Sequence, residues 1–515
     1  MLRSIRVILA IILVIGINLL STLVSARLDL TEGKVYTLSD STKQITSSLQ
    51  EDIQVKVFIS DKLPSQAEVI RQQLVDKIND YESLSNGKIK VSYQDPSKDE
   101  SVAKLVQMLG IPELQLQVIE KDQRQVVRAY IGLALIKEKA EKVESDDLTA
   151  NIEKVETIPV IQDLSTFEYD FTAALLKISM DQEKTIGFLE GHEEHSLSDP
   201  QGNRLVAASP RADYGFAEIL NKNYVVQSVN ISEKKPEITG IDTLVIAGPK
   251  TKLADYEWTA IKNFLASGGN VVLLADRINA GQGLQIEITE EDFAPLLSEY
   301  GISVEQKLIA DASQAPANFS QGFITYTIPY PLWIKTRQEN INKENSITGQ
   351  VESFVLPWAN PLTLEEKESI TKTVLATTSE YYALVEGDVS LNPQSDFGIT
   401  KNTKDKLPVV VLAEKEGQGK LLVVGDSDFA ANSFTGQFEG NSILFSNIID
   451  GLTLGDALIS IRSKGLTDRP LSNLSEIQKN IIRWGNTILI PLLFIVYGLI
   501  RRHIRNEKKK FLTTS

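Results

Sequence analysis

Two apolar segments, one near each end of the chain, constrain the fold of this 515-residue sequence more than any other feature. The first, at 7–26, is 20 residues long and carries no charge, which is the length a helix needs to cross a membrane. The second, at 481–500, begins near Trp484 and contains Pro491, which membrane helices tolerate better than soluble helices do. The pattern predicts a transmembrane helix at each end.

Positive charge beside both segments predicts their orientation. Two arginines precede the first segment, and a basic tail at 501–515 follows the second. Because Lys and Arg stay on the cytoplasmic side, we expect an inner-membrane protein with both termini in the cytoplasm and a large periplasmic domain. The bilayer is then a partner. A cleaved signal peptide is the alternative for 7–26, since residues 24–26 fit the small-residue cleavage pattern.

Composition excludes several functions. The chain has no cysteine, so disulfides, thiolate metal sites and a cysteine nucleophile are excluded. Its net charge is −15 although both ends are basic, so the stretch between them is strongly acidic. Such a surface repels a phosphate backbone, and nucleic acid is therefore excluded as a partner.

The first soluble part, 28–147, has the pattern of an α/β domain. An alternating strand at 53–60 is followed by helical spacing over 64–84, a second strand and a second helix. Two long strands then meet near 121–123. This order is that of a thioredoxin-like domain. Residues 60–63 read Ser-Asp-Lys-Leu where such folds carry redox cysteines, so we expect no thiol chemistry.

A second α/β pattern covers 184–456, after a connecting segment at 148–183. Its strands alternate with helices, which predicts a parallel sheet with functional loops at the carboxyl ends of the strands. The stretch at about 279–368 is less regular and is interpreted as an insertion that is rich in aromatic residues. These aromatics are expected to pack in the core, or alternatively to line a groove for a glycan or peptide. A juxtamembrane segment at 457–480 completes the chain.

Acidic residues follow three predicted strands of the second domain, at Glu190, Asp276 and Asp426, with His192 and Asp428 close by. Parallel strands place such ends along one edge of a sheet, so the five residues are a candidate ligand-binding site. The alternative is that they only cap helices and close turns. The histidine pair that begins at His192 lacks the spacing of a metalloprotease motif, so neither a metal site nor a cofactor is predicted.

Catalytic motifs are missing from the sequence. The stretch at 417–421 has neither the glycine spacing nor the Ser/Thr of a phosphate-binding loop. A G-x-S-x-G serine elbow is also missing, and amidotransferase chemistry requires a cysteine. We therefore predict that the chain is not an enzyme and that any ATP is hydrolysed by another subunit.

Several stretches resemble one known family. They are RLDLTEGKVYTLSDST at 27–42, FLEGHEEHSL at 188–197, the segment at 242–276, GKLLVVGDSDFAAN at 419–432 and ISIRSKGLTDRPLSNLSE at 459–476. These stretches resemble the gliding-motility-associated ABC-transporter auxiliary proteins. The resemblance implies a thioredoxin-like domain, then a glutamine-amidotransferase-like or flavodoxin-like domain, and association with an ABC permease and ATPase.

Two kinds of function remain open. The first is a non-catalytic, membrane-anchored auxiliary subunit of an ABC-type transport system. The alternative is a hydrolase or transferase acting on envelope polymers, or a module that binds a small molecule or polymer, with the strand-end carboxylates as its site.

Overall fold

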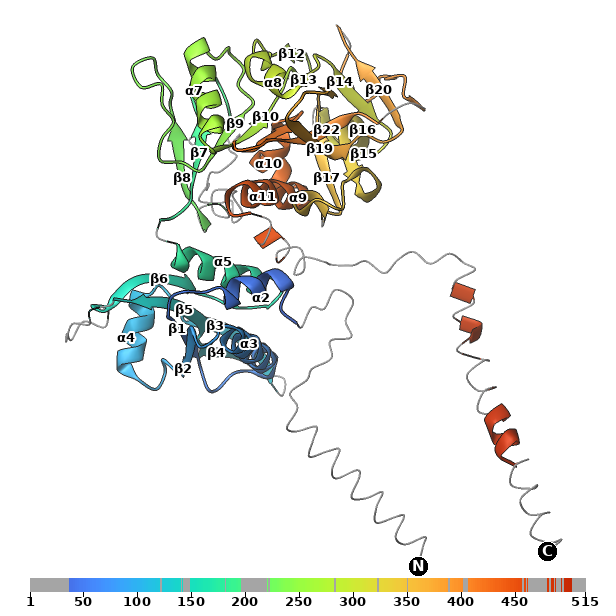
Figure 1. Ribbon diagram of the computed structural model, residues 1–515. Helices are drawn as coiled ribbons and strands as arrows, with labels where there is room; N and C mark the ends of the chain where they lie inside the picture. The colour runs from blue at the N-terminus through green and yellow to red at the C-terminus, as the bar shows by residue number, and fades with distance from the viewer. Residues whose placement is uncertain are drawn as a thin grey trace, which may run out of the picture. The chain divides into compact units, whose positions relative to one another are not determined.

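The computed structural model describes most of the chain, and Figure 1 shows its elements. The described residues are 37–195 and 220–461, except 121–122, 140, 142–148, 181, 221–222, 282–283, 322–323, 350, 388–389, 402–405, 456–457 and 460, together with parts of 479–502. The chain divides into two compact units, 1–466 and 467–515. The first unit contains all the sheets described below.

A four-stranded sheet with the order β2-β1-β5-β6 forms the first α/β part. Its strands are β1 (Ile53–Ile59), β2 (Ile89–Gln94), β5 (Ile131–Glu138) and β6 (Ile152–Ile158), and its helices are α2 (Asp40–Ser47), α3 (Ser65–Leu84), α4 (Glu100–Met108) and α5 (Phe167–Ser179). Strands β1 and β2 are parallel, and β5 is antiparallel to β1 and β6. Alternate residues of β1 face opposite sides: Val57 packs with α3 and α5, and Phe58 packs with α4.

The hairpin of β3 (Leu114–Glu120) and β4 (Gln123–Ala129) forms a two-stranded sheet of its own. The two strands therefore meet near 121–123, where the sequence predicts the junction of two long strands. The segment 148–183, expected as a connection, contains β6 and α5.

The second α/β part is built on a seven-stranded sheet with the order β19-β22-β23-β10-β9-β7-β8. Its strands are β7 (Thr185–Leu189), β8 (Val225–Val229), β9 (Thr243–Ala247), β10 (Asn270–Leu274), β19 (Ile370–Thr377), β22 (Pro408–Lys415) and β23 (Leu421–Val424). Strands β8, β7, β9, β10 and β23 are parallel, whereas β22 and β19 are antiparallel to their neighbours.

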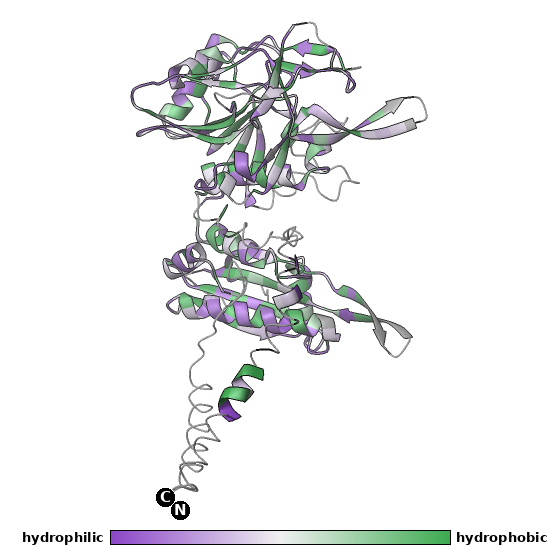
Figure 2. Ribbon diagram, turned by 90° about the vertical axis from the view of Figure 1, so that its right-hand side faces the viewer, coloured by the Kyte–Doolittle hydropathy of each residue, from purple (hydrophilic) through white to green (hydrophobic). Residues whose placement is uncertain are grey.

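Helices cover both faces of this sheet, which explains why its central strands are continuous apolar runs. Helix α7 (Asp255–Ala266) packs through Trp258 and Ile261 on the face that carries Leu273. Helix α11 (Glu439–Thr453) packs through Phe445 on the face that carries Val272. Figure 2 shows these strands coloured as hydrophobic.

Short antiparallel elements occupy most of the chain between β10 and β22. They are β11 (Ile278–Ala280), β12 (Ile286–Ile288), α8 (Ala294–Tyr300), β13 (Ile302–Val304), β14 (Leu308–Asp311), β15 (Gln314–Gln321), β16 (Ile324–Arg337), η1 (Gln338–Asn340), α9 (Ser346–Gly349), β17 (Ser353–Pro357), β18 (Leu362–Leu364), β20 (Tyr381–Val385) and β21 (Thr400–Lys401). The aromatic residues here pack on one another. Trp333 meets Trp358 edge to face at 5.9 Å and Phe434 at 5.0 Å. Phe434 belongs to α10 (Asn432–Thr435), which follows the short helix η2 (Asp428–Ala430).

The prediction of flanking transmembrane helices is contradicted. Within the described residues, no helix is both long and apolar enough to cross a membrane. The segment 7–26 lies outside the described residues, and 481–500 is described only in part. The predicted inner-membrane location, with both termini in the cytoplasm, depended on these helices and is therefore contradicted as well.

The predicted fold class is corrected at the same time. The described residues form a mixed α/β protein with seven sheets, rather than two α/β domains between membrane helices. Apolar runs locate strands but do not determine their pairing. Strands β10 and β23, for example, pair across about 150 residues of intervening chain.

Candidate functional site

The carboxyl ends of four parallel strands meet at one edge of the seven-stranded sheet. Leu274 of β10 pairs with Val424 of β23 and with Ala247 of β9, so the loops after these strands lie side by side. These loops and the residues around them enclose a cavity of about 560 Å³. It is lined by Glu193, Glu194, His195, Gly248, Lys250, Asp276, Asn279, Ala280, Gly281, Glu287, Trp358, Ser427 and Asp428.

A pair of hydrogen bonds joins the loop after β10 to the loop after β23. The backbone N–H of Ser427 donates to Asp276 Oδ1 at 2.9 Å, and the Ser427 hydroxyl donates to Asp276 Oδ2. Both residues are buried. The loop after β9 leaves room for them, because Gly248 has a φ of +62° and a Cβ there would collide with the Ser427 side chain. Both the left-handed backbone and the nearby Ser427 side chain therefore require glycine at this position.

His195 contacts the same group from the loop after β7. Its Nε2 lies 2.9 Å from Ser427 Oγ and 3.5 Å from Asp428 Oδ1. Asn279 of β11 donates to Asp428 Oδ2 at 2.7 Å, which holds the carboxylate from its other side. In a Ser-His-Asp triad the serine and the aspartate contact different ring nitrogens, whereas here one nitrogen faces both. The arrangement is a hydrogen-bond network and not a triad.

The three aspartates of this network differ in their pKa values. Burial, together with the charge of Asp428, raises the pKa of Asp276 to about 7. Burial also raises the pKa of Asp426 well above its usual value, and the charges of Asp276 and Asp428 add to that effect. Burial opposes ionisation of Asp428 as well, but its contacts with His195 and Asn279 outweigh burial and lower its pKa. The negative charge therefore rests first on Asp428.

Asp426 is a structural member of the group. Its carboxyl accepts the backbone N–H groups of Asp428 at 3.2 Å and Phe429 at 3.1 Å. It is fully buried and is not among the residues that line the cavity. These hydrogen bonds are those of a residue that closes a turn, which was the alternative interpretation of the strand-end carboxyl groups.

His192 and Glu190 lie elsewhere. His192 Nδ1 lies 3.1 Å from Glu194, and its Nε2 lies 3.1 Å from Glu257 of α7. Glu257 in turn accepts the backbone N–H of Ala254 at 2.7 Å, so His192 ties the loop after β7 to the first turn of α7. Glu190 donates its backbone N–H to Val229 of β8 and does not line the cavity.

Of the five predicted site residues, the structure thus brings together Asp276, Asp426 and Asp428. His195 and Ser427 join them, and both stand inside the motifs that the sequence analysis singled out. Lys250, Glu287 and Trp358 were missed, because nothing in the sequence connects these distant positions with the strand ends.

The chemistry of the cavity follows from its lining. The Ser427 hydroxyl is buried and bonded to Asp276, so it is not presented as a nucleophile. Among the described residues, no group of three or more His, Asp or Glu side chains is placed to hold a metal ion. The charged side chains of the lining are acidic, apart from Lys250 and His195. Such a surface attracts positive charge.

Comparison with known proteins assigns the part of the chain that contains the cavity. Residues 183–450 match the family model of an ABC-type uncharacterized transport system. The chain belongs to this ABC-type transport family. Residues 32–136 match a domain of unknown function. The resemblance stated from the sequence is therefore confirmed for the ABC-type transport system, whereas a specific connection with gliding motility is not shown.

Relatives of this family member are distant. An uncharacterized protein of Borreliella burgdorferi is 23% identical, and the match covers 92% of both chains. The intraflagellar transport protein 52 homolog of Mus musculus is 25% identical over 46% of this chain and 50% of its own.

Solved structures give only weak matches. The mouse IFT52 N-terminal domain has a TM-score of 0.34 at 18% identity, covering 52% of this chain and 97% of its own. A ThuA-like protein of Bacteroides uniformis has a TM-score of 0.28 at 12% identity, with 52% and 89% covered. Likenesses at these scores support no inference about function.

Proposed function

We propose that this protein is a non-catalytic auxiliary component of an ABC-type transport system, and that it binds a ligand in the strand-end cavity. The observation that carries the proposal is the extent of the family match. Residues 183–450 span the strands and loops that form the cavity, from β7 to Asp428. The partners are the permease and ATPase subunits of the system.

The state of the polar groups supports a binding role rather than a catalytic one. Ser427 and Asp276 hold each other, and Asp426 is occupied by backbone N–H groups. The sequence has no phosphate-binding loop, so the energy of transport comes from another subunit. A cavity of about 560 Å³ at the carboxyl ends of parallel strands is a typical place and size for a small-ligand site.

The direct test is co-purification. The full-length chain, tagged and expressed in its own organism, is cross-linked in living cells and purified, and its partners are identified by mass spectrometry. We expect an ABC ATPase and a permease, both missing from the same preparation of an unrelated tagged protein. Recovery without any ABC subunit, or ATP turnover by the purified chain alone, contradicts the proposal.

A hydrolase or transferase is the second candidate, and one observation favours it. Asp276 and Asp428 line the same cavity, and their pKa values are shifted in opposite directions, as in pairs of a general acid and a general base. The test is turnover of a panel of chromogenic glycosides and esters by the full-length chain. Activity that is lost in Asp276→Asn supports this candidate, and an inactive native protein rejects it.

A further inference from the structure

We propose that the ligand of the strand-end cavity is a small organic polycation, that is, a flexible molecule with at least two ammonium groups. This inference rests on the proposed function, because it names the ligand class for the same cavity. Three features of the cavity lead to it: the sign of its charge, the different elements that carry that charge, and an aromatic wall.

The charge of the lining is strongly unbalanced. Five of the described residues that line the cavity carry carboxyl groups. The described lining contains one lysine, Lys250. Glu193 and Glu287 are exposed. Asp428 is held as a carboxylate by His195 and Asn279. Low-dielectric walls of one sign concentrate ligands of the opposite sign.

Three of the five carboxyl groups of the lining come from different elements of the fold. Glu193 comes from the loop after β7, Asp428 from the loop after β23, and Glu287 from β12. A metal ion needs several ligands that converge within bonding distance, and the described residues contain no such group. Carboxylates contributed by different elements instead match a ligand that carries more than one positive charge on a flexible chain.

The position of Glu287 depends on a glycine. Its side chain lies against Gly281 so closely that a Cβ at Gly281 would overlap it. Glycine at this position therefore makes room for the carboxylate of Glu287 beside the cavity.

Trp358 adds an aromatic wall. The indole ring is the aromatic group that binds ammonium ions best. Trp358 is held in place by edge-to-face contacts with Trp333 and Phe434, each at 5.9 Å. Its backbone N–H donates to Leu332 of β16 at 2.7 Å. A fixed indole beside acidic residues favours an ammonium ligand over a neutral one, because both features act on the same positive charge.

The experiment is isothermal titration of the full-length protein with spermidine, and separately with Mg²⁺ and with glucose, at about 0.15 M salt, where long-range attraction is screened. We expect saturable binding of one spermidine per chain and at least tenfold weaker binding of Mg²⁺ and glucose. Undetectable spermidine binding overturns the proposal. A preference for Mg²⁺ overturns it in favour of a metal ion, and a preference for glucose in favour of a neutral polyol.

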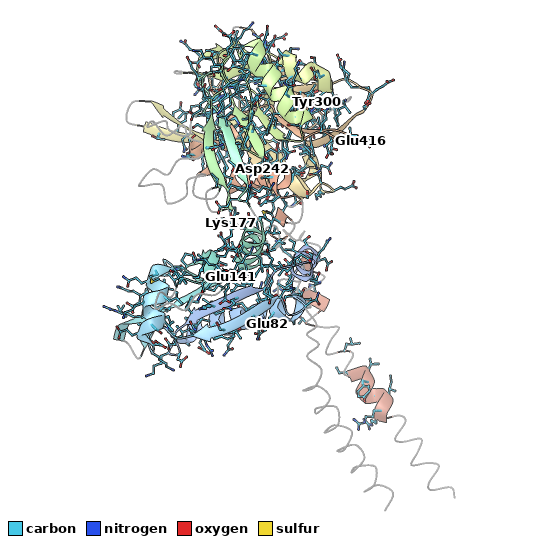
Figure 3. All side chains as sticks on the ribbon, turned by 60° about the vertical axis from the view of Figure 1, so that its left-hand side comes forward. Glu82, Glu141, Lys177, Asp242, Tyr300 and Glu416 are labelled. Atoms are coloured by element: carbon cyan, nitrogen blue, oxygen red, sulfur yellow. The ribbon has the colours of Figure 1, made fainter. Side chains whose placement is uncertain are left out.

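Variants then locate the binding. The double change Glu193→Gln and Glu287→Gln removes two exposed carboxylates from the cavity and should weaken spermidine binding about tenfold, as expected for two partly screened ion pairs. The matched control is Glu416→Gln, in the exposed turn between β22 and β23 and labelled in Figure 3. That turn precedes the amino end of β23, at the opposite edge of the sheet. Equal weakening by the control shows non-specific attraction to an acidic protein and overturns the proposal.

Failure of this inference and failure of the proposed function give different results. If the chain co-purifies with ABC subunits but does not bind spermidine, the proposed transport role stands and the proposed ligand class is wrong. If it binds spermidine at the cavity without any ABC partner, the proposed ligand class stands and the proposed transport role is wrong.

Discussion

The two parallel strand edges of this protein carry similar residues in different environments. In the four-stranded sheet, Asp61 and Asp95 follow the parallel strands β1 and β2. Asp61 is exposed and paired with Lys98. In the seven-stranded sheet, Asp276 and Asp426 follow β10 and β23 and are buried.

The two edges differ in how deeply their carboxyl groups are buried. Burial also acts to raise the pKa of Asp95, but hydrogen bonds from Ser97 and from the backbone of Asp61 outweigh it and lower that pKa. The pKa of Asp276 rises to about 7 although Ser427 donates two hydrogen bonds to it. The same residue type at the same kind of strand end is thus a turn-forming carboxylate in one sheet and part of a buried network in the other.

The largest expected effect comes from filling the space beside Ser427. Gly248→Ala should destabilise the protein by about 3–4 kcal/mol, because a Cβ there meets Ser427 and the backbone is left-handed. Gly417→Ala is the matched control: its φ is +75°, but nothing lies near a Cβ at that position. It should cost about 1–2 kcal/mol. Urea unfolding measures both, and equal losses would show that the packing against Ser427 is unimportant.

A smaller effect, with a definite pH dependence, is expected for Asp276→Asn. The folded-state pKa of Asp276, about 7, lies above that of an unfolded aspartate, so its contribution to stability is lost as the pH rises from about 4 to about 7. The groups that face Asp276 are Asp426, Asp428, His195 and Ser427. The amide mimics the protonated acid, so the variant should be more stable than the native protein by about 2 kcal/mol above pH 7. Equal stability of the two at pH 8 would contradict the raised pKa.

Asp95→Asn should act in the opposite direction. The pKa of Asp95 is lowered in the folded state, so its contribution is present above the pKa of an unfolded aspartate and is lost as the pH falls below about 4. The variant should lose about 1 kcal/mol at pH 7, the usual value of such a hydrogen-bonded carboxylate. Thermal unfolding at pH 7 and pH 3 tests this, and a stabilised variant at pH 7 would erase the contrast between the two edges.

The smallest effect is expected at the exposed pair of Lys98 and Asp61. Lys98→Ala should leave the unfolding midpoint unchanged within error, because water and salt screen an ion pair whose side chains are both more than half exposed. A clear loss of stability that disappears at high salt would show that this edge, too, depends on its charges.

Part of the site could be predicted from the sequence. Apolar runs that end in Glu190, Asp276 and Asp426 correctly located three parallel strands, and the parallel arrangement placed their ends at one edge. The prediction of membrane helices came from the apolar length of two segments, and no helix among the described residues is long and apolar enough to cross a membrane.

Only the tertiary structure decided which of these residues act together. His192 and His195 are three residues apart, and nothing in the sequence distinguishes their roles. In the structure, the first contacts Glu257 of α7 and the second contacts Ser427. The sequence by itself determined the strands, the strand-end carboxyl groups and the resemblance to the transport family. The tertiary structure determined the burial that raises the pKa of Asp276, and it brought Trp358 to the cavity. The physical reason is that burial and charge coupling depend on neighbours far away in the chain, which no local pattern records.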